Sequence, residues 1–215
     1  MSNIEIVNSN HLINYSDSIK MMEKRVYDIH QGNKKELIWF LNHDHIYTCG
    51  TSSSEKEIIK KTNTPIIKTN RGGKITYHGP GQRIVYFVID LKKRKKDIRK
   101  FISLIENSLI LFLKNYDIDS TTYKDRVGVW VTKYQNIKLQ KEEKIGAIGL
   151  RLKKWITYHG LSVNINPDLN YYKNIHSCGL ESYNNTSLSK LNIKIQNKDF
   201  DENYKKIFLN ELERF

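Results

Sequence analysis

Apolar residues recur at intervals of three and four along two long stretches of the chain. In residues 15–31 they include Ile19, Met22, Val26 and Ile29, and a similar spacing runs through residues 98–116. This period predicts amphipathic helices that cover a core. A third helix is predicted at residues 202–214, with Asp199 or Asp201 as its cap.

Shorter runs of β-branched and aromatic residues, bounded by glycine, proline and polar positions, predict strands between these helices. They lie at residues 37–41, 46–49, 65–69, 84–91, 128–132, 144–151 and 155–164. A short helical piece is expected near residues 169–173. Because helices stand between groups of strands, the order favours an α+β fold, with a mixed β-sheet packed with helices. Without a linker or an internal repeat, residues 1–215 are expected to form a single catalytic domain.

One segment of the chain cannot be regular throughout. Residues 71–82 contain four glycines and one proline, and we expect them to form a shaped loop. Glycines at this density allow backbone amides to approach a ligand closely, and Arg71, Lys74, Tyr77 and His78 add further donors. The spacing matches neither the dinucleotide fingerprint nor the P-loop, and a tight structural turn is the alternative.

Composition narrows the class of protein. The 215 residues are 39% hydrophobic, which suits a folded chain, and no apolar stretch approaches the length of a membrane helix. The N-terminus lacks the order of a signal peptide, so we expect a cytoplasmic protein that does not bind a membrane. The net charge of +13 would suit nucleic acid, but no nucleic-acid-binding signature accompanies it. A basic surface can also attract an acidic protein partner.

The chain has two cysteines, and each needs its own explanation. Cys178 precedes Gly179 in a polar, irregular segment, where a thiol can be exposed to substrate and act as a nucleophile. A nucleophilic thiol needs a nearby cation or base. Lys144, which opens a largely apolar run, could serve, and His159 or His176 could form a Cys-His dyad instead.

A metal site is not expected. His43 and His45 would share one face of a strand near Cys49, but no second cluster with the spacing of a zinc site completes the set. Cys49 is therefore expected to pack against neighbours or to form part of a pocket wall.

Three blocks of sequence together resemble the lipoyl(octanoyl) transferase family. Residues 71–82 read RGGKITYHGPGQ, and residues 144–164 read KIGAIGLRLKKWITYHGLSVN. The third block is SCGL around Cys178, followed by Thr186, Ser187 and Leu188. The resemblance runs from about Asn42 to Leu188. The chain departs from the usual family pattern at Asp44, Cys49 and Ser177.

The resemblance implies a fold like that of the catalytic domains of biotin and lipoate protein ligases. It also implies an octanoyl thioester on Cys178, with Lys144 lowering the pKa of the thiol, and so favours lysine over histidine as the base. Substrate contacts would come from Arg71, Gly72, Gly73, Lys74, Ile75, Thr76, Tyr77, His78, Ala147, Ile148, Gly149, Gly160, Leu161 and Ser162.

The expected donor is octanoyl-acyl carrier protein. The expected acceptors are lipoyl domains of 2-oxoacid dehydrogenases and the glycine-cleavage H protein. No cofactor is needed, because the thioester supplies the energy, and we expect a monomer.

The acyl chain is expected along Ile75, Tyr77, Ala147, Ile148 and Leu161, with His78 or backbone amides near Gly149 as oxyanion donors. An ATP-dependent lipoate or biotin ligase, or a binding module without turnover, is the rival hypothesis.

Overall fold

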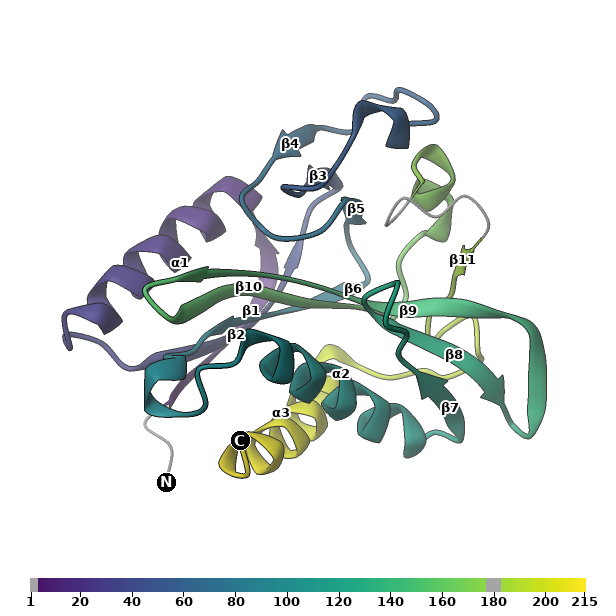
Figure 1. Cartoon of the computed structure of the whole chain (residues 1–215). Coiled ribbons are helices and arrows are strands. Elements are labelled where there is room, and N and C mark those ends of the chain that lie inside the picture. The colour runs from purple at the N-terminus through teal and green to yellow at the C-terminus, as the bar shows by residue number, and fades with distance from the viewer. Residues whose placement is uncertain (1–3, 177–182) are drawn as a thin grey trace.

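A large mixed β-sheet forms the centre of the computed structural model, which describes residues 4–176 and 183–215. In this part of the chain the sheet has eight strands, in the order β1-β2-β6-β10-β9-β8-β7, with β11 beside β9 (Figure 1). Their bounds are β1 Ile4–Ile13, β2 Glu36–His43, β6 Gln82–Val88, β7 Ile118–Thr121, β8 Val129–Tyr134, β9 Ile137–Lys153, β10 Ile156–Asn164 and β11 Asn184–Asn185.

Both pairing directions occur in this sheet. The β1–β2 and β11–β9 pairs are parallel, and the other neighbours along the path are antiparallel. The mixed sheet and its helices confirm the predicted fold class. A second sheet, in the order β4-β3-β5, lies above the large one in Figure 1. Its strands are β3 Ile46–Cys49, β4 Ile66–Lys68 and β5 Ile75–His78, and short 3₁₀ helices occur at η1 Glu55–Glu57, η2 Leu91–Lys93 and η3 Leu169–Asn174.

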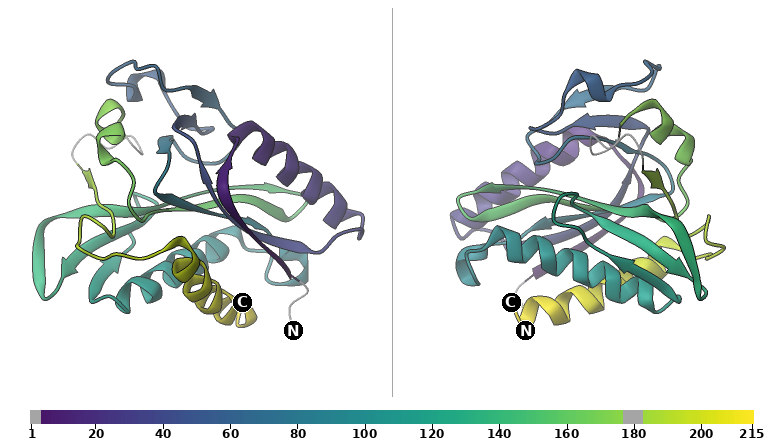
Figure 2. Two further views of the ribbon diagram at one scale, coloured as in Figure 1. Left: turned by 180° about the vertical axis from the view of Figure 1, so that it is seen from behind. Right: turned by 45° about the vertical axis from the view of Figure 1, so that its right-hand side comes forward.

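Helices cover both faces of the large sheet. Helix α1 (Tyr15–His30) packs on one face, while α2 (Ile98–Lys114) and α3 (Asn197–Glu213) pack on the other (Figures 1 and 2). The side of α2 and α3 holds the larger core, in which the Phe87 and Phe208 rings lie 4.6 Å apart. Burial of each such aromatic side chain contributes roughly 1.5–3 kcal/mol. Because each helix buries one apolar face against the sheet, its apolar residues recur at helical spacing, and this spacing predicted α1 and α2.

Capping explains where the first two helices begin. The Asn14 side chain accepts a hydrogen bond from Asp17 N at 3.2 Å, and Asp97 accepts from the amides of Arg99 and Lys100 at 3.0 Å. Each cap satisfies amides that the first turn of a helix leaves without partners.

The predicted start of the third helix was wrong. Helix α3 begins at Asn197 after Gln196, whose side chain makes no capping bond. Asp201, one of the two predicted caps, lies inside the helix and is buried. It accepts a hydrogen bond from Arg83 Nε on β6 at 2.8 Å, so it pairs the helix with the sheet instead.

Strands β1, β5, β7 and β11 were not predicted by the sequence analysis, and β9 begins at Ile137 rather than at Lys144. Residues 4–13 were given no element there and form β1, the edge strand beside β2. The glycine-rich segment is less irregular than expected, because Ile75–His78 is strand β5. The glycines flank that strand and permit the turns on either side.

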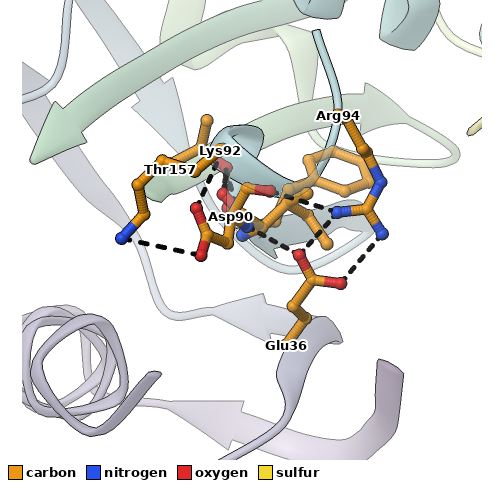
Figure 3. Close-up of polar contacts among 7 residues, drawn as sticks. Glu36, Asp90, Lys92, Arg94 and Thr157 are labelled. Carbon is orange, nitrogen blue, oxygen red and sulfur yellow. Dashed lines mark hydrogen bonds and ion pairs between the residues drawn. The ribbon is translucent and has the colours of Figure 1, made fainter. Parts of the chain in front are cut away.

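A network of ion pairs and hydrogen bonds lies at one end of the large sheet (Figure 3). Arg94 donates to both carboxylate oxygens of Glu36, at 2.6 and 2.8 Å, and to the backbone oxygen of Asp90 at 3.3 Å. Asp90 N donates to Glu36 at 2.7 Å, and the Asp90 side chain caps η2 through Lys92 N. The network joins the start of β2 to the segment that follows β6.

Among the helices of the described residues, none is long and apolar enough to span a membrane.

Candidate active site

A cavity of about 220 Å³ lies between the large sheet and the glycine-rich segment. Most of the predicted substrate contacts line it, although they come from three separate parts of the chain. These residues are Arg71, Gly73, Lys74, Ile75, Thr76, His78, Ala147, Ile148, Gly149, Gly160, Leu161 and Ser162. Gly72 and Tyr77, which were also predicted, are not in its lining.

The register of β9 against β10 explains why two of these segments meet. Ala147 faces Ser162, Ile148 faces Leu161, and Gly149 faces Gly160 across the antiparallel ladder. The three cross-strand pairs therefore form one continuous wall.

The glycine-rich segment is held against this wall by its backbone. Gly72 N donates to Leu150 O at 3.0 Å. The approach is close enough that a Cβ atom on Gly149 would lie 2.9 Å from Gly72 O. Glycine at position 149 thus permits the loop and the strand to touch. Gly72 does not line the cavity, but its backbone bond holds the loop against the wall.

Arg71 is buried and holds the loop to the small sheet. Its Nη2 donates to Thr48 Oγ1 at 2.8 Å and to Thr48 O, and its Nη1 donates to Gly72 O at 3.0 Å. The guanidinium is therefore fixed by protein groups beside the cavity. Its main role is to stabilise the wall of the cavity.

Tyr77 belongs to the aromatic cluster of the small sheet. Its hydroxyl lies 2.7 Å from His45 Nδ1, and its ring stacks on Tyr171 with centroids 4.7 Å apart. The alternation of β5 places Thr76 and His78 toward the cavity, while Tyr77 packs away from it. Ile75 is the exception, because it contacts both the cluster and the cavity.

Lys144 is a buried amine, only 4% exposed, inside β9 rather than at a solvated strand end. Its Nζ donates to Val127 O at 2.7 Å and lies 5.1 Å from the centre of the Trp130 ring. A small pocket around Lys144 shares Thr76, Ala147 and Ser162 with the main cavity. The amine therefore lies in a pocket that adjoins the cavity, which suits a base acting on a ligand there.

Cys178, the predicted nucleophile, lies outside the described residues, as do Ser177 and Gly179. The chain that follows passes Lys144, because Asn185 pairs with Lys144 in the β11–β9 ladder and Thr186 N donates to Lys144 O at 2.8 Å. On the other side, His176 N donates to Glu57 O at 2.7 Å.

Three buried histidines surround the cavity or lie behind it. Burial lowers the pKa of His43 to about 4, and of His78 and His159 to about 3 each. These imidazoles are neutral at pH 7, since the charged form would lose its hydration. His159, the alternative base, lines the cavity and bonds through Nε2 to Asn70 Oδ1 at 2.9 Å.

The hydrogen bonds of His78 argue against its predicted role as an oxyanion donor. His78 Nδ1 lies 2.6 Å from Gln82 Oε1, and the Gln82 amide nitrogen donates to Asn164 and Tyr172. The Gln82 oxygen must then accept, so Nδ1 carries the proton of the neutral ring. The other nitrogen is left as an acceptor, which leaves backbone amides as the remaining oxyanion donors.

The cavity also has walls that the sequence analysis did not identify. Tyr15, Ile84 and Tyr86 form its buried part together with His159, which the sequence analysis named only as an alternative base, and residues 125–127 also line it. Single residues of a helix or of a neighbouring strand carry no local motif. Only the β2-β6-β10 pairing and the position of α1 bring them here.

Within residues 4–176 and 183–215, no group of three or more His, Cys, Asp or Glu side chains could hold a metal ion. His43 bonds instead to Ile13 O and the Tyr86 hydroxyl, at 2.7 Å each, and His45 to Tyr77.

Comparison with known proteins gives a consistent picture. The lipoyl protein ligase A/B catalytic domain matches residues 14–209. The octanoyltransferase of Wolbachia sp. subsp. Brugia malayi (strain TRS) is 45% identical over 206 residues, which are 95% of this chain and 98% of that relative.

Solved structures extend the likeness to the fold. A bi-partite lipoate protein ligase from Thermoplasma acidophilum has a TM-score of 0.71 at 13% identity, covering 99% of this chain and 85% of that one. Biotin protein ligase from Aquifex aeolicus, in complex with biotin and ATP, has a TM-score of 0.57 at 13% identity, covering 100% of this chain and 72% of that one. At such low identity the likeness shows a shared fold.

Proposed function

Because this chain belongs to the lipoyl(octanoyl) transferase family, we propose that it transfers an octanoyl group from octanoyl-acyl carrier protein to a lysine of an acceptor protein. The acceptors would be lipoyl domains of 2-oxoacid dehydrogenases and the glycine-cleavage H protein, and the reaction would be the first step of protein lipoylation. The observation that carries this proposal is the buried amine of Lys144, in a small pocket that adjoins a cavity lined by the three predicted segments.

The first half of the reaction transfers the acyl group to the enzyme. The Cys178 thiolate attacks the thioester carbonyl carbon of the donor, and a tetrahedral oxyanion forms. A new carbon–sulfur bond to Cys178 replaces the bond to the donor sulfur, and the donor leaves as a thiol after taking the proton of Lys144, which becomes neutral. The positive charge of Lys144 favours the thiolate form of Cys178.

The second half transfers the acyl group to the acceptor. The neutral amine of the acceptor lysine attacks the octanoyl-enzyme, an amide bond forms, and the bond to Cys178 breaks. The attacking nitrogen gives its proton to Lys144, and the thiolate is regenerated. The thioester supplies the free energy, so this scheme uses no ATP.

The cavity offers the acyl chain an apolar path. Ile75, Ile148 and Leu161 line it together with Ala147, which borders both the cavity and the pocket of Lys144. We place the carbonyl end of the chain near Ala147 and its tail toward the buried part that Tyr15 and Tyr86 enclose. Tyr77 has no place in this path.

The net charge of +13 supports docking of acidic protein partners. Complementary charge raises the rate of encounter, and salt screens it. The transfer rate at low substrate concentration should therefore fall as ionic strength rises. A rate that is indifferent to salt would count against electrostatic docking. A cytoplasmic location stays a prediction.

Trapping the intermediate tests the covalent scheme. The protein is mixed with octanoyl-acyl carrier protein without acceptor and without ATP, and its intact mass is measured. We expect one added octanoyl group on the wild type and on Cys49→Ser, and none on Cys178→Ser. An ATP-dependent ligase or a binding module would give no adduct. Full transfer to a lipoyl domain by Cys178→Ser would refute the scheme.

A further inference from the structure

Helix α2 carries a carboxyl group in an unusual place. Glu106 is only 8% exposed, on the helix face that also buries Ile105 and Leu109 against the sheet. A carboxylate is rarely buried unless it has partners, because the charged form loses its hydration. The surroundings of Glu106 therefore need an explanation beyond packing.

The partner of Glu106 is a single peptide group next to the active-site lysine. Glu106 Oε1 accepts a hydrogen bond from Gly128 N at 3.1 Å. The carbonyl of the same peptide group, Val127 O, accepts from Lys144 Nζ at 2.7 Å. The Val127–Gly128 peptide thus links the amine to the carboxyl through two hydrogen bonds. Bonds arranged in such a chain polarise and strengthen one another.

Gly128 leaves the space that the lysine occupies beside this peptide. Gly128 has φ of 129°, and a Cβ atom there would lie 2.5 Å from Lys144 Cε and 3.0 Å from Lys144 Nζ. Only glycine leaves room for the lysine, so the amine and the carboxyl lie on either side of one small residue.

Electrostatics agree with this arrangement. Burial raises the pKa of the Glu106 carboxyl, while the hydrogen bond from Gly128 and the positive charge of Lys144 act to lower it. Since the interaction of two charges is mutual, the carboxyl of Glu106 and the amine of Lys144 are coupled electrostatically across this peptide.

We propose that Glu106 is a positioning residue for Lys144, which aims the Val127 carbonyl at the amine and places a carboxyl group on the far side of the same peptide. This inference rests on the proposed function. It adds that the second half of the reaction, in which Lys144 must be neutral to accept a proton, is controlled from α2.

The test separates the charge of Glu106 from its hydrogen bond. Glu106→Gln keeps an oxygen that can accept from Gly128 N but removes the charge, and Glu106→Asp keeps the charge on a shorter side chain. The octanoyl-enzyme of each variant is isolated and mixed with hydroxylamine, which stays neutral across the pH range used. Formation of octanoyl hydroxamate is then followed against pH, and thermal melting checks the fold.

In the wild type the rate should rise with pH as Lys144 loses its proton. In Glu106→Gln this rise should move down by about one pH unit, because the ammonium has lost its counter-charge. Glu106→Asp should stay close to the wild type. An unmoved or upward-shifted rise in a folded Glu106→Gln protein would overturn the inference. If the wild type forms no octanoyl-enzyme, the proposed function fails instead, so the two failures are distinguishable.

Discussion

Lys144 and Gly128 are in such close contact that a single methyl group on Gly128 would displace the lysine, because its Cβ would lie 2.5 Å from Lys144 Cε. Gly128→Ala should therefore lower the transfer rate by roughly 100-fold, the cost of a small misplacement of a catalytic group. It should also destabilise the fold by about 1–3 kcal/mol, through backbone strain and through contact of the new methyl group with Gly146 O, which lies 2.6 Å from the Cβ position.

Gly32→Ala provides the matched control for that strain. Gly32 also has positive φ, at 78°, but nothing lies within 4 Å of the Cβ position. This variant should lose stability and keep its transfer rate. Equal loss of activity in both variants would show that strain, rather than contact with Lys144, is the cause.

Lys144→Ala should raise the apparent pKa of the Cys178 thiol by about one unit, because the thiolate loses a stabilising positive charge. The measurement is the rate of alkylation by iodoacetamide against pH, resolved by peptide mass so that Cys49 serves as an internal reference. If the Cys178 profile stays in place, Lys144 does not set the reactivity of this thiol.

Ala147→Leu should block the acyl path where the cavity meets the pocket of Lys144. We expect octanoyl transfer to fall roughly tenfold or more, since a few methylene groups decide the fit of such a cavity. A short butyryl donor should be less affected. Ala147→Ser, which adds little volume, is the control. Equal losses for both donors would contradict this placement of the chain.

The buried histidines should make the fold sensitive to acid. The folded pKa values of about 4, 3 and 3 for His43, His78 and His159 lie below the unfolded value near 6.5. The unfolded chain therefore binds more protons, and stability is fully present above pH 6.5 and lost as pH falls toward the folded values. Near pH 5.5 the three groups should lower the free energy of unfolding by about 4 kcal/mol for each pH unit that the pH falls.

Chemical denaturation at several pH values measures this slope. His43, which bonds to Ile13 O and to Tyr86, is the member of the three that lies outside the cavity lining. His43→Asn should reduce the slope by about one proton. A slope that this substitution leaves unchanged would mean that burial does not hold His43 neutral.

Arg94→Met should destabilise the protein without slowing transfer, because the network of Figure 3 lies at the end of β2 away from His43. Glu36 would stay buried without its main partner, at a cost of about 3 kcal/mol. Urea unfolding measures this loss. The double variant Arg94→Met with Glu36→Gln should recover part of it, and no recovery would show that the pairing is not the cause.

Local signals predicted those parts of the fold that depend on period and composition. Helices α1 and α2 follow from apolar spacing, and the structure adds the caps at Asn14 and Asp97, which the sequence analysis did not name. Strand β1 carries no such signal, since it becomes a strand only by pairing with β2. The start of α3 was wrong because Asp201 serves a distant arginine rather than a helix end.

The candidate site shows the same division. Motif spacing identified the glycine-rich segment and the segments of β9 and β10. The β9–β10 ladder, in which Ala147 faces Ser162, brings the last two together. Tyr77 was expected in the acyl path as one of the apolar side chains that could line a slot for the chain. The alternation of a strand that the sequence did not reveal turns its ring away. Glu106 could not be found, because its partner is a backbone amide on another element.

Helix α2 has two structural roles, and both of them limit how its sequence can change during evolution. Its apolar face fills the main core, while its carboxyl at position 106 reaches the peptide beside Lys144. A core substitution that rotates or slides α2 slightly would leave a well-folded protein whose chemistry has drifted. Selection for activity should therefore remove more substitutions in α2 than selection for folding does, even at positions remote from any substrate.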